Sequence, residues 1–151
     1  MAGEDWARYW RADGVPVEAM HAHFTSHVYH RHSHESYSFG VTETGAQAFT
    51  CRHGRHVSAS GMVMAFNPDD PHDGHAAVDG GFTYRMVHIW PEFLASLTGT
   101  PLPLFRSPHW RWLRHLPKPS ATPTRVTSNR SIPIRCGKAP PSPIMAMSMK
   151  G

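Results

Sequence analysis

The sequence has few cysteines, no long apolar run and none of the common nucleophile motifs. Its two cysteines, Cys51 and Cys136, form no spaced motif, which argues against a disulfide framework and favours a reduced, cytoplasmic protein. No apolar stretch has the length of a transmembrane helix, and the acidic N-terminus lacks the apolar segment of a secretory signal. We therefore expect no membrane association. Gly-x-Ser-x-Gly and a phosphate-binding glycine loop are also missing, which leaves no nucleophile constellation for catalysis.

Acidic residues are absent from the C-terminal third of the chain. Residues 1–100 carry all eleven acids and six arginines, a net charge of −5, whereas residues 101–151 carry six arginines, three lysines and no acid, a net charge of +9. Ten of the 14 prolines also lie after residue 100, and proline at this density interrupts helices and sheets alike. We expect one globular domain over 1–108 and a disordered, basic, Pro-rich tail over 109–151. A tail that is merely basic predicts no specific DNA binding by this chain alone.

The first 108 residues do carry the pattern of a β-protein. Short apolar stretches, alternating or continuous, are separated by turn residues, which is typical of strands. A turn at residues 43–45 separates two of them, and Pro91 and Gly99 delimit a short C-terminal helix. Trp6 and Trp10 are expected in a short helix or in an arm over the barrel mouth. The pattern predicts a mainly β barrel or sandwich, with strands over residues 17–24, 37–41, 46–51, 56–58, 62–66 and 82–90.

Three histidines stand out from the thirteen in the chain. His32 and His34 are separated by one residue, so on a strand they would share one face. His72 follows the turn sequence Asn67-Pro68-Asp69-Asp70-Pro71, in which Pro, Asn and Asp all favour a tight reversal. A bend that brings His72 beside the pair would create a polar focus inside a barrel. Such a focus suits either a small-molecule pocket or a metal site.

Five segments share their order and spacing with a known family: residues 30–41, the turn at Gly45, residues 61–68, residues 71–74 and residues 84–86. Together they resemble, over residues 6–108, the N-terminal domain of AraC-type transcription regulators. The resemblance implies a cupin-like, jelly-roll barrel that binds a small effector, such as a sugar or small organic acid, and that forms a homodimer. An intact regulator continues with a helix-turn-helix domain that binds DNA. The residues after Pro108 lack that pattern, and our hypothesis is a truncation or frameshift near this codon.

The resemblance and the strand pattern together assign the effector site. Apolar walls with a few orienting polar groups are typical of such pockets, and the last strand places His88 and Trp90 on one face. We expect no catalytic residue, no cofactor and no enzyme activity. The expected effector-binding residues are His32, His34, Tyr37, Phe39, His72, His88 and Trp90.

Metal-dependent cupin enzymes offer an alternative interpretation of the same histidines. Those enzymes resemble this domain and hold their metal with a His-x-His pair, a glutamate four or five residues later and a distant histidine. Here Ser38 and Phe39 stand where that glutamate is expected. Three imidazoles can still bind zinc with a water in the fourth place. The alternative is a stand-alone dioxygenase or isomerase that uses His32, His34 and His72, but the missing carboxylate favours an effector pocket without a metal.

Overall fold

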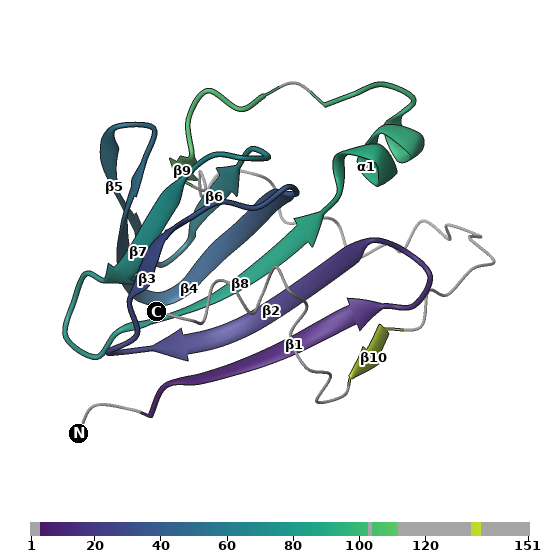
Figure 1. Cartoon of the computed structure of the whole chain (residues 1–151). Coiled ribbons are helices and arrows are strands. Elements are labelled where there is room, and N and C mark those ends of the chain that lie inside the picture. The colour runs from purple at the N-terminus through teal and green to yellow at the C-terminus, as the bar shows by residue number, and fades with distance from the viewer. Residues whose placement is uncertain (1–3, 103, 112–133, 137–151) are drawn as a thin grey trace, which may run out of the picture.

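The computed structural model describes residues 4–102, 104–111 and 134–136. Within these residues the chain forms ten strands and one helix (Figure 1). The elements are β1 (Trp6–Ala12), β2 (Val17–Phe24), β3 (Tyr29–His32), β4 (Tyr37–Cys51), β5 (Gly54–Ala59), β6 (Met62–Phe66), β7 (His72–Ala76), β8 (Phe82–Ile89), α1 (Pro91–Thr98), β9 (His109–Arg111) and β10 (Ile134–Cys136). The prediction of a mainly β protein with one short C-terminal helix is confirmed.

The strands pair antiparallel into one curled sheet. Its main path runs β10-β1-β2-β8-β4-β6-β9, while β7 joins β4 to β3 and β5 pairs with β4. Figure 1 shows β3 and β7 lying over β4, where the sheet curls around its interior. Burial alternates along β2 and β8, as expected for strands with one face toward a core. The inward residues pair across the two strands as Phe24 with Phe82, Ala22 with Tyr84 and Met20 with Met86.

Residues 37–51 form one strand rather than the two strands that the turn sequence predicted. β4 pairs with β6 and β8 over its first nine residues and with β5 and β7 over its last six. A bulge between Thr42 and Thr44 bends the strand, and Gly45 follows with φ +70°. The turn residues therefore produce a bulge, which lets one strand pass from one half of the sheet to the other.

The two faces of β4 are the reverse of what the aromatic pattern predicted. Ser38 and Thr42 are inward and buried, whereas the rings of Tyr37 and Phe39 lie on the outer face. There both rings pack edge-on against Phe105, at centroid distances of 6.2 and 5.7 Å. Alternation identified which residues share a face, but a second apolar layer on the outside makes the aromatic face the outer one.

The N-terminal segment forms a strand, not the helix or arm that we expected. β1 pairs with β2 along its length, from Trp6 opposite His23 to Arg11 opposite Glu18. Arg11 also donates two hydrogen bonds to the buried Glu18 carboxylate, at 3.0 and 2.7 Å. The ladder satisfies the backbone polar groups that an arm would leave to water.

The helix and the segment after it are only partly as predicted. α1 begins at Pro91 and ends before Gly99, whose N–H donates to the Ala95 carbonyl as a C-cap. Beyond Pro108, the predicted disorder does not hold for residues 109–111 and 134–136, which form β9 and β10 against β6 and β1. The rest of the predicted tail lies outside the described residues.

One apolar cluster fills the interior of the curled sheet. Its aromatic members include Phe24, Phe66 and Phe82, each 3% exposed or less. The buried histidines His34, His72 and His88 adjoin this cluster, with the His72 ring 4.1 Å from that of Phe66. Among the described residues, no helix has the length and apolarity needed to cross a membrane.

Candidate functional site

Two strand ends, one loop and the inward face of β8 bring four histidines together. His32 is the last residue of β3, His34 lies in the loop after it, and His72 opens β7, which pairs with β3. His88 enters from β8 on the inward face. The prediction that His32, His34 and His72 lie close together is confirmed. The predicted cause, a shared strand face, is wrong, because β3 ends at His32 and His34 lies in the loop after it. The loop, rather than a shared strand face, turns its ring inward.

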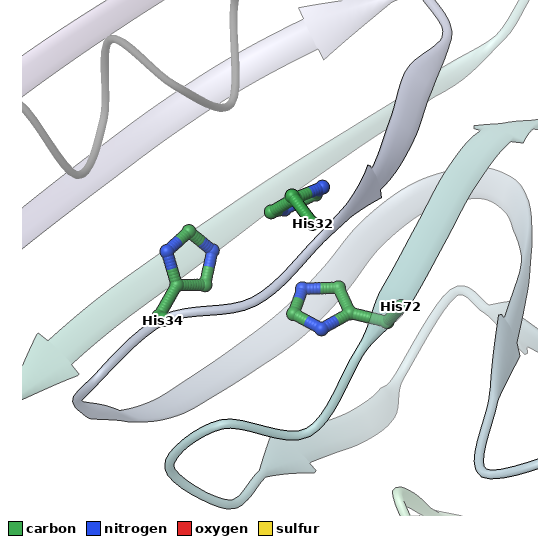
Figure 2. Close-up of side chains that lie close together, drawn as sticks. All are labelled: His32, His34 and His72. Carbon is green, nitrogen blue, oxygen red and sulfur yellow. The ribbon is translucent and has the colours of Figure 1, made fainter.

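The four imidazoles form a compact group. The centroid of the His72 ring lies 4.5 Å from that of His32 and 5.4 Å from that of His34, and the His34 centroid lies 4.7 Å from that of His88. Figure 2 shows the rings of His32, His34 and His72 turned toward a common space. His72 also stacks on Phe66 at 4.1 Å. This stacking holds the ring flat against the core.

Hydrogen bonds fix which nitrogen of His72 carries the proton. Its Nδ1 lies 2.8 Å from the carbonyl oxygen of Asp70. A carbonyl only accepts, so Nδ1 carries hydrogen and the lone pair of the neutral ring is on Nε2. The Nδ1 of His32 donates in the same way to the His30 carbonyl, at 2.6 Å. On the opposite wall, Nδ1 of His88 is hydrogen-bonded to the Ser38 hydroxyl at 2.8 Å.

Burial keeps three of these histidines uncharged. It lowers the pKa of His72 to about 4, with a further contribution from the neighbouring His32. It also lowers the pKa of His88 to about 4. For His34, burial and the three neighbouring imidazoles lower the pKa to about 2. At pH 7 these rings are neutral, so each offers one N–H donor and one lone pair.

A small cavity lies beside the imidazoles, with a volume of about 40 Å³. A water molecule needs about 10–15 Å³ measured in this way, so the cavity holds roughly three waters or a ligand of a few atoms. A large part of the cavity wall was not predicted from the sequence. Tyr84 and Met86 could have been found, because they lie on the same inward face of β8 as His88. The wall residues that were missed are Met20, Tyr29, Ser38, Gln47, Asp73, Gly74, Tyr84 and Met86.

The cavity wall also carries two buried phenols. The hydroxyls of Tyr29 and Tyr84 lie 2.7 Å apart and are hydrogen-bonded to each other. Burial raises the pKa of both phenols above the ordinary value, so both stay protonated. The cavity wall therefore carries two protonated hydroxyls besides the imidazoles, and the Tyr29 ring lies 5.9 Å from that of His32.

Three predicted effector-binding residues lie away from this cavity. Tyr37 and Phe39 occupy the outer face of β4, and the Tyr37 hydroxyl donates to the Leu102 carbonyl at 2.9 Å. Trp90 precedes α1 as its N-cap residue and is not part of the cavity wall. The structure thus brings His32, His34, His72 and His88 together and separates the three aromatic residues from them.

Three of these imidazoles offer ring nitrogens that could bind a metal ion. One ring nitrogen from each of His32, His34 and His72 lies within 4.8 Å of the others, and within the described part of the chain no carboxylate belongs to this group. In tetrahedral zinc sites two nitrogens bonded at about 2.1 Å lie roughly 3.4 Å apart, so the most widely separated rings would have to approach by about 1.4 Å. After that adjustment the residues fit an ion with three imidazole ligands and an open position.

The curled sheet and its small, partly open cavity lined by histidines are the architecture of a barrel-like β-domain. The family model described as the AraC-like ligand binding domain matches residues 14–118, and the chain belongs to that family. The match extends ten residues past Pro108, the predicted end of the domain. A search of curated proteins found no match.

Solved structures with a similar fold are cupins and related proteins. A conserved protein of unknown function from Streptococcus pyogenes is 17% identical, with a TM-score of 0.51 over 60% of this chain and 80% of its own. A cupin superfamily protein from Desulfitobacterium hafniense is 12% identical, with a TM-score of 0.51 over 60% of this chain and 83% of its own. A variant of Bacillus subtilis oxalate decarboxylase is 14% identical, with a TM-score of 0.50 over 78% of this chain and 40% of its own.

These similarities at low identity show the cupin fold alone. The chain spans about two fifths of the oxalate decarboxylase chains that it matches. Their activity is a property of those enzymes.

Proposed function

We propose that the chain acts as the small-molecule-sensing and dimerisation domain of an AraC-type transcription regulator. The observation that carries this proposal is a partly open cavity, with four imidazoles on its wall, inside a domain of the AraC-like ligand-binding family. Effector binding would shift the balance between conformations that differ in ligand affinity. Formation of a homodimer and a cytoplasmic location are parts of the same proposal.

The protonation state of the site favours a hydroxyl compound over an ionised organic acid. His72 presents the lone pair of Nε2, because its Nδ1–H is bonded to the Asp70 carbonyl. A carboxylate also offers only lone pairs, so it cannot bond Nε2 of His72 while that ring is neutral, and the lowered pKa of His72 keeps the ring neutral at pH 7. A hydroxyl can donate to Nε2 and also accept from a phenol or an imidazole N–H of the same wall. A small sugar or polyol therefore suits the charge pattern better than an acid.

The cavity volume limits the size of such a ligand. About 40 Å³ is far below the roughly 300–1,000 Å³ of pockets for drug-sized ligands. Met20 and Met86 lie on the wall, and their unbranched side chains adapt easily to a change in shape. We propose that these two side chains move aside when the effector enters.

A thermal-shift screen with calorimetric follow-up tests the proposal. The ligands are monosaccharides and polyols in one set and small carboxylates in a second. A ligand that binds only the folded state raises the melting temperature. We expect a hydroxyl compound to do so, and the effect to be lost in His72→Asn, which lacks a group at the Nε2 position. His75→Asn, changed on the exposed side of the same strand, should keep it. Absence of any stabilising ligand in either set would overturn the proposal.

A metal-dependent cupin activity is the second candidate, favoured by the convergence of His32, His34 and His72. An ion at such a site acts as a Lewis acid and lowers the pKa of bound water. The chain itself would contribute the imidazoles of His34 and His72, which are already neutral at pH 7 and need not lose a proton to bind the ion. Their orientation is set in part by the hydrogen bond from His72 Nδ1–H to the Asp70 carbonyl.

Metal analysis of the purified protein separates the two candidates. Stoichiometric iron, manganese or zinc that is lost in both His34→Gln and His72→Asn, and retained in His75→Asn, would support the metal site. Protein without bound metal that also fails to bind zinc in a calorimetric titration would contradict it. The same preparations serve for the ligand screen.

A further inference from the structure

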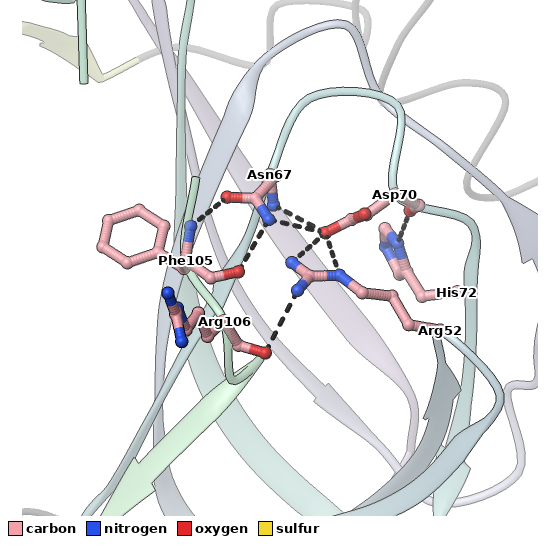
Figure 3. A network of polar contacts seen from close by, with 6 residues as sticks. All are labelled: Arg52, Asn67, Asp70, His72, Phe105 and Arg106. Atoms are coloured by element: carbon pink, nitrogen blue, oxygen red, sulfur yellow. Dashed lines mark hydrogen bonds and ion pairs between the residues drawn. The ribbon is translucent and has the colours of Figure 1, made fainter. Parts of the chain in front are cut away.

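A polar network lies next to the cavity, at the turn between β6 and β7 (Figure 3). Its centre is the Asp70 carboxylate, which accepts from Arg52 Nε at 2.8 Å and from Arg52 Nη2. The same oxygen accepts from the side-chain amide and the backbone N–H of Asn67, at 2.9 and 3.2 Å. The Arg52–Asp70 ion pair is largely shielded, with side chains 30% and 17% exposed. It is therefore stronger than an ordinary surface pair.

The network holds the segment that follows α1. We call residues 104–108 the strap. Asn67 Oδ1 accepts from the Phe105 N–H at 2.7 Å, and Asn67 Nδ2 donates to the Phe105 carbonyl at 3.0 Å. Arg52 Nη1 donates to the Arg106 carbonyl at 3.1 Å. These are side-chain contacts to backbone atoms, so they recognise the position of the strap and not its side chains.

The network also holds the pocket. The Asp70 carbonyl accepts from Nδ1 of His72, and the N–H of Asp69 donates to the His34 carbonyl at 2.7 Å. Asp69 has φ +61°, a conformation that costs energy in a residue other than glycine and persists only where its surroundings enforce it. The turn is thus fixed on one side by the strap and on the other by two histidines of the pocket.

We propose that Arg52, Asn67 and Asp70 are positioning residues that couple the seating of the strap to the orientation of His72. When the strap is bound, the turn presents the Asp70 carbonyl to Nδ1 and directs Nε2 of His72 to the cavity. When the strap leaves, Asn67 loses both partners on Phe105 and the turn loses its anchor. The His72 ring then exchanges between its two tautomers. Ligand binding at Nε2 would in turn favour the seated strap, because coupling between two sites is reciprocal.

The coupling concerns the pocket of the proposed function, but its test needs no ligand. In ¹⁵N NMR of the histidine rings, the wild-type protein should show His72 as the single Nδ1–H tautomer. Asn67→Ala and Arg52→Gln leave His72 itself intact, and both should show a mixture of tautomers. Arg52→Lys retains the charge and should be closer to wild type. Arg85→Gln, which breaks an ion pair with Glu43 on the outer face, is the matched control and should show no change.

The reciprocal effect is measured at the strap. His72→Gln keeps a polar group near the Nε2 position but removes the donor to Asp70, whereas His72→Asn keeps a donor near the Nδ1 position. We expect amide hydrogen exchange of Phe105 to accelerate by about fivefold or more in His72→Gln, the lower end of typical coupling, and to stay near the wild-type rate in His72→Asn. These two His72 variants still test the coupling if Asn67→Ala does not fold.

An unchanged His72 tautomer in folded Arg52→Gln, or equal exchange at Phe105 in the two His72 variants, would overturn the coupling. Neither result would affect binding of an effector by the pocket. Conversely, a failed ligand screen would leave the tautomer and exchange measurements valid.

Discussion

Gly45→Ala should destabilise the domain through two separate effects. Gly45 has φ +70°, and an L-residue in this left-handed region costs about 1–2 kcal/mol. A Cβ here would overlap the Gly81 carbonyl oxygen and lie 3.0 Å from the Cα of Phe82. Both are backbone atoms, so the strands must shift, at a cost of about 1–3 kcal/mol. We expect a total loss of about 2–5 kcal/mol, a large part of the roughly 5–15 kcal/mol that stabilises a domain.

Gly61→Ala separates the two effects. Gly61 has φ +81° and no atom within 4 Å of the place where its Cβ would lie, so it should lose only about 1–2 kcal/mol. Urea unfolding followed by circular dichroism gives the free energy of unfolding of each variant, and the m-value shows whether unfolding exposes the same surface. If the losses at Gly45 and Gly61 agree within about 0.5 kcal/mol, the range of ordinary surface substitutions, the steric argument is refuted.

Further predictions concern the cavity wall, an N-terminal carboxylate and a buried thiol. Ser38→Ala removes the partner 2.8 Å from buried His88 Nδ1 and should cost about 1–3 kcal/mol in urea unfolding at pH 7. Ser36→Ala, at 3.5 Å, should cost clearly less, and equal losses would contradict this. Burial alone would raise the pKa of Asp5, but hydrogen bonds from the β2–β3 loop outweigh that effect and lower the pKa. Asp5→Ala should therefore be less stable than wild type at pH 7. That deficit should shrink as pH falls below the ordinary carboxyl pKa, where the unfolded wild type takes up a proton, and a pH-independent deficit would count against it. Cys51 is 1% exposed, and burial raises its pKa, so peptide mapping should find it alkylated by iodoacetamide only after unfolding.

Local patterns predicted the positions of most elements, but they gave the wrong inward face for the first part of β4. β2, β6, β8 and α1 were found from apolar spacing and from the residues that bound them, Pro91 and Gly99. β4 was divided wrongly, because Gly45 has the same sequence signature in a bulge as in a turn. Its residues Tyr37 and Phe39 were placed inside because a barrel usually encloses its large side chains. Contact with Phe105, more than sixty residues away, turns them outward.

In the candidate site, too, local sequence patterns identified some residues, whereas contacts between distant segments were not predicted. Spacing alone marked His32, His34 and His72, and the alternation of β8 placed His88 inside. The two phenols escaped prediction because β3 and β8 do not pair, and the side chains of Tyr29 and Tyr84 meet only across the interior of the curled sheet. The network around Asp70 was missed for a related reason. Its partners are backbone atoms of Phe105 and Arg106, which carry no sequence signal.

The place of β8 between β2 and β4 has a consequence for how the chain emerges from the ribosome. β2 ends at Phe24 and its second partner begins at Phe82, so in the growing chain the edge of β2 away from β1 has no partner while the intervening residues are added. At about 5–20 residues per second this lasts roughly 3–12 s. During that time the apolar face of β2, with Met20 and Phe24, is open to chaperones or to a neighbouring nascent chain. His88 arrives with β8, so the cavity is completed only when the sheet closes.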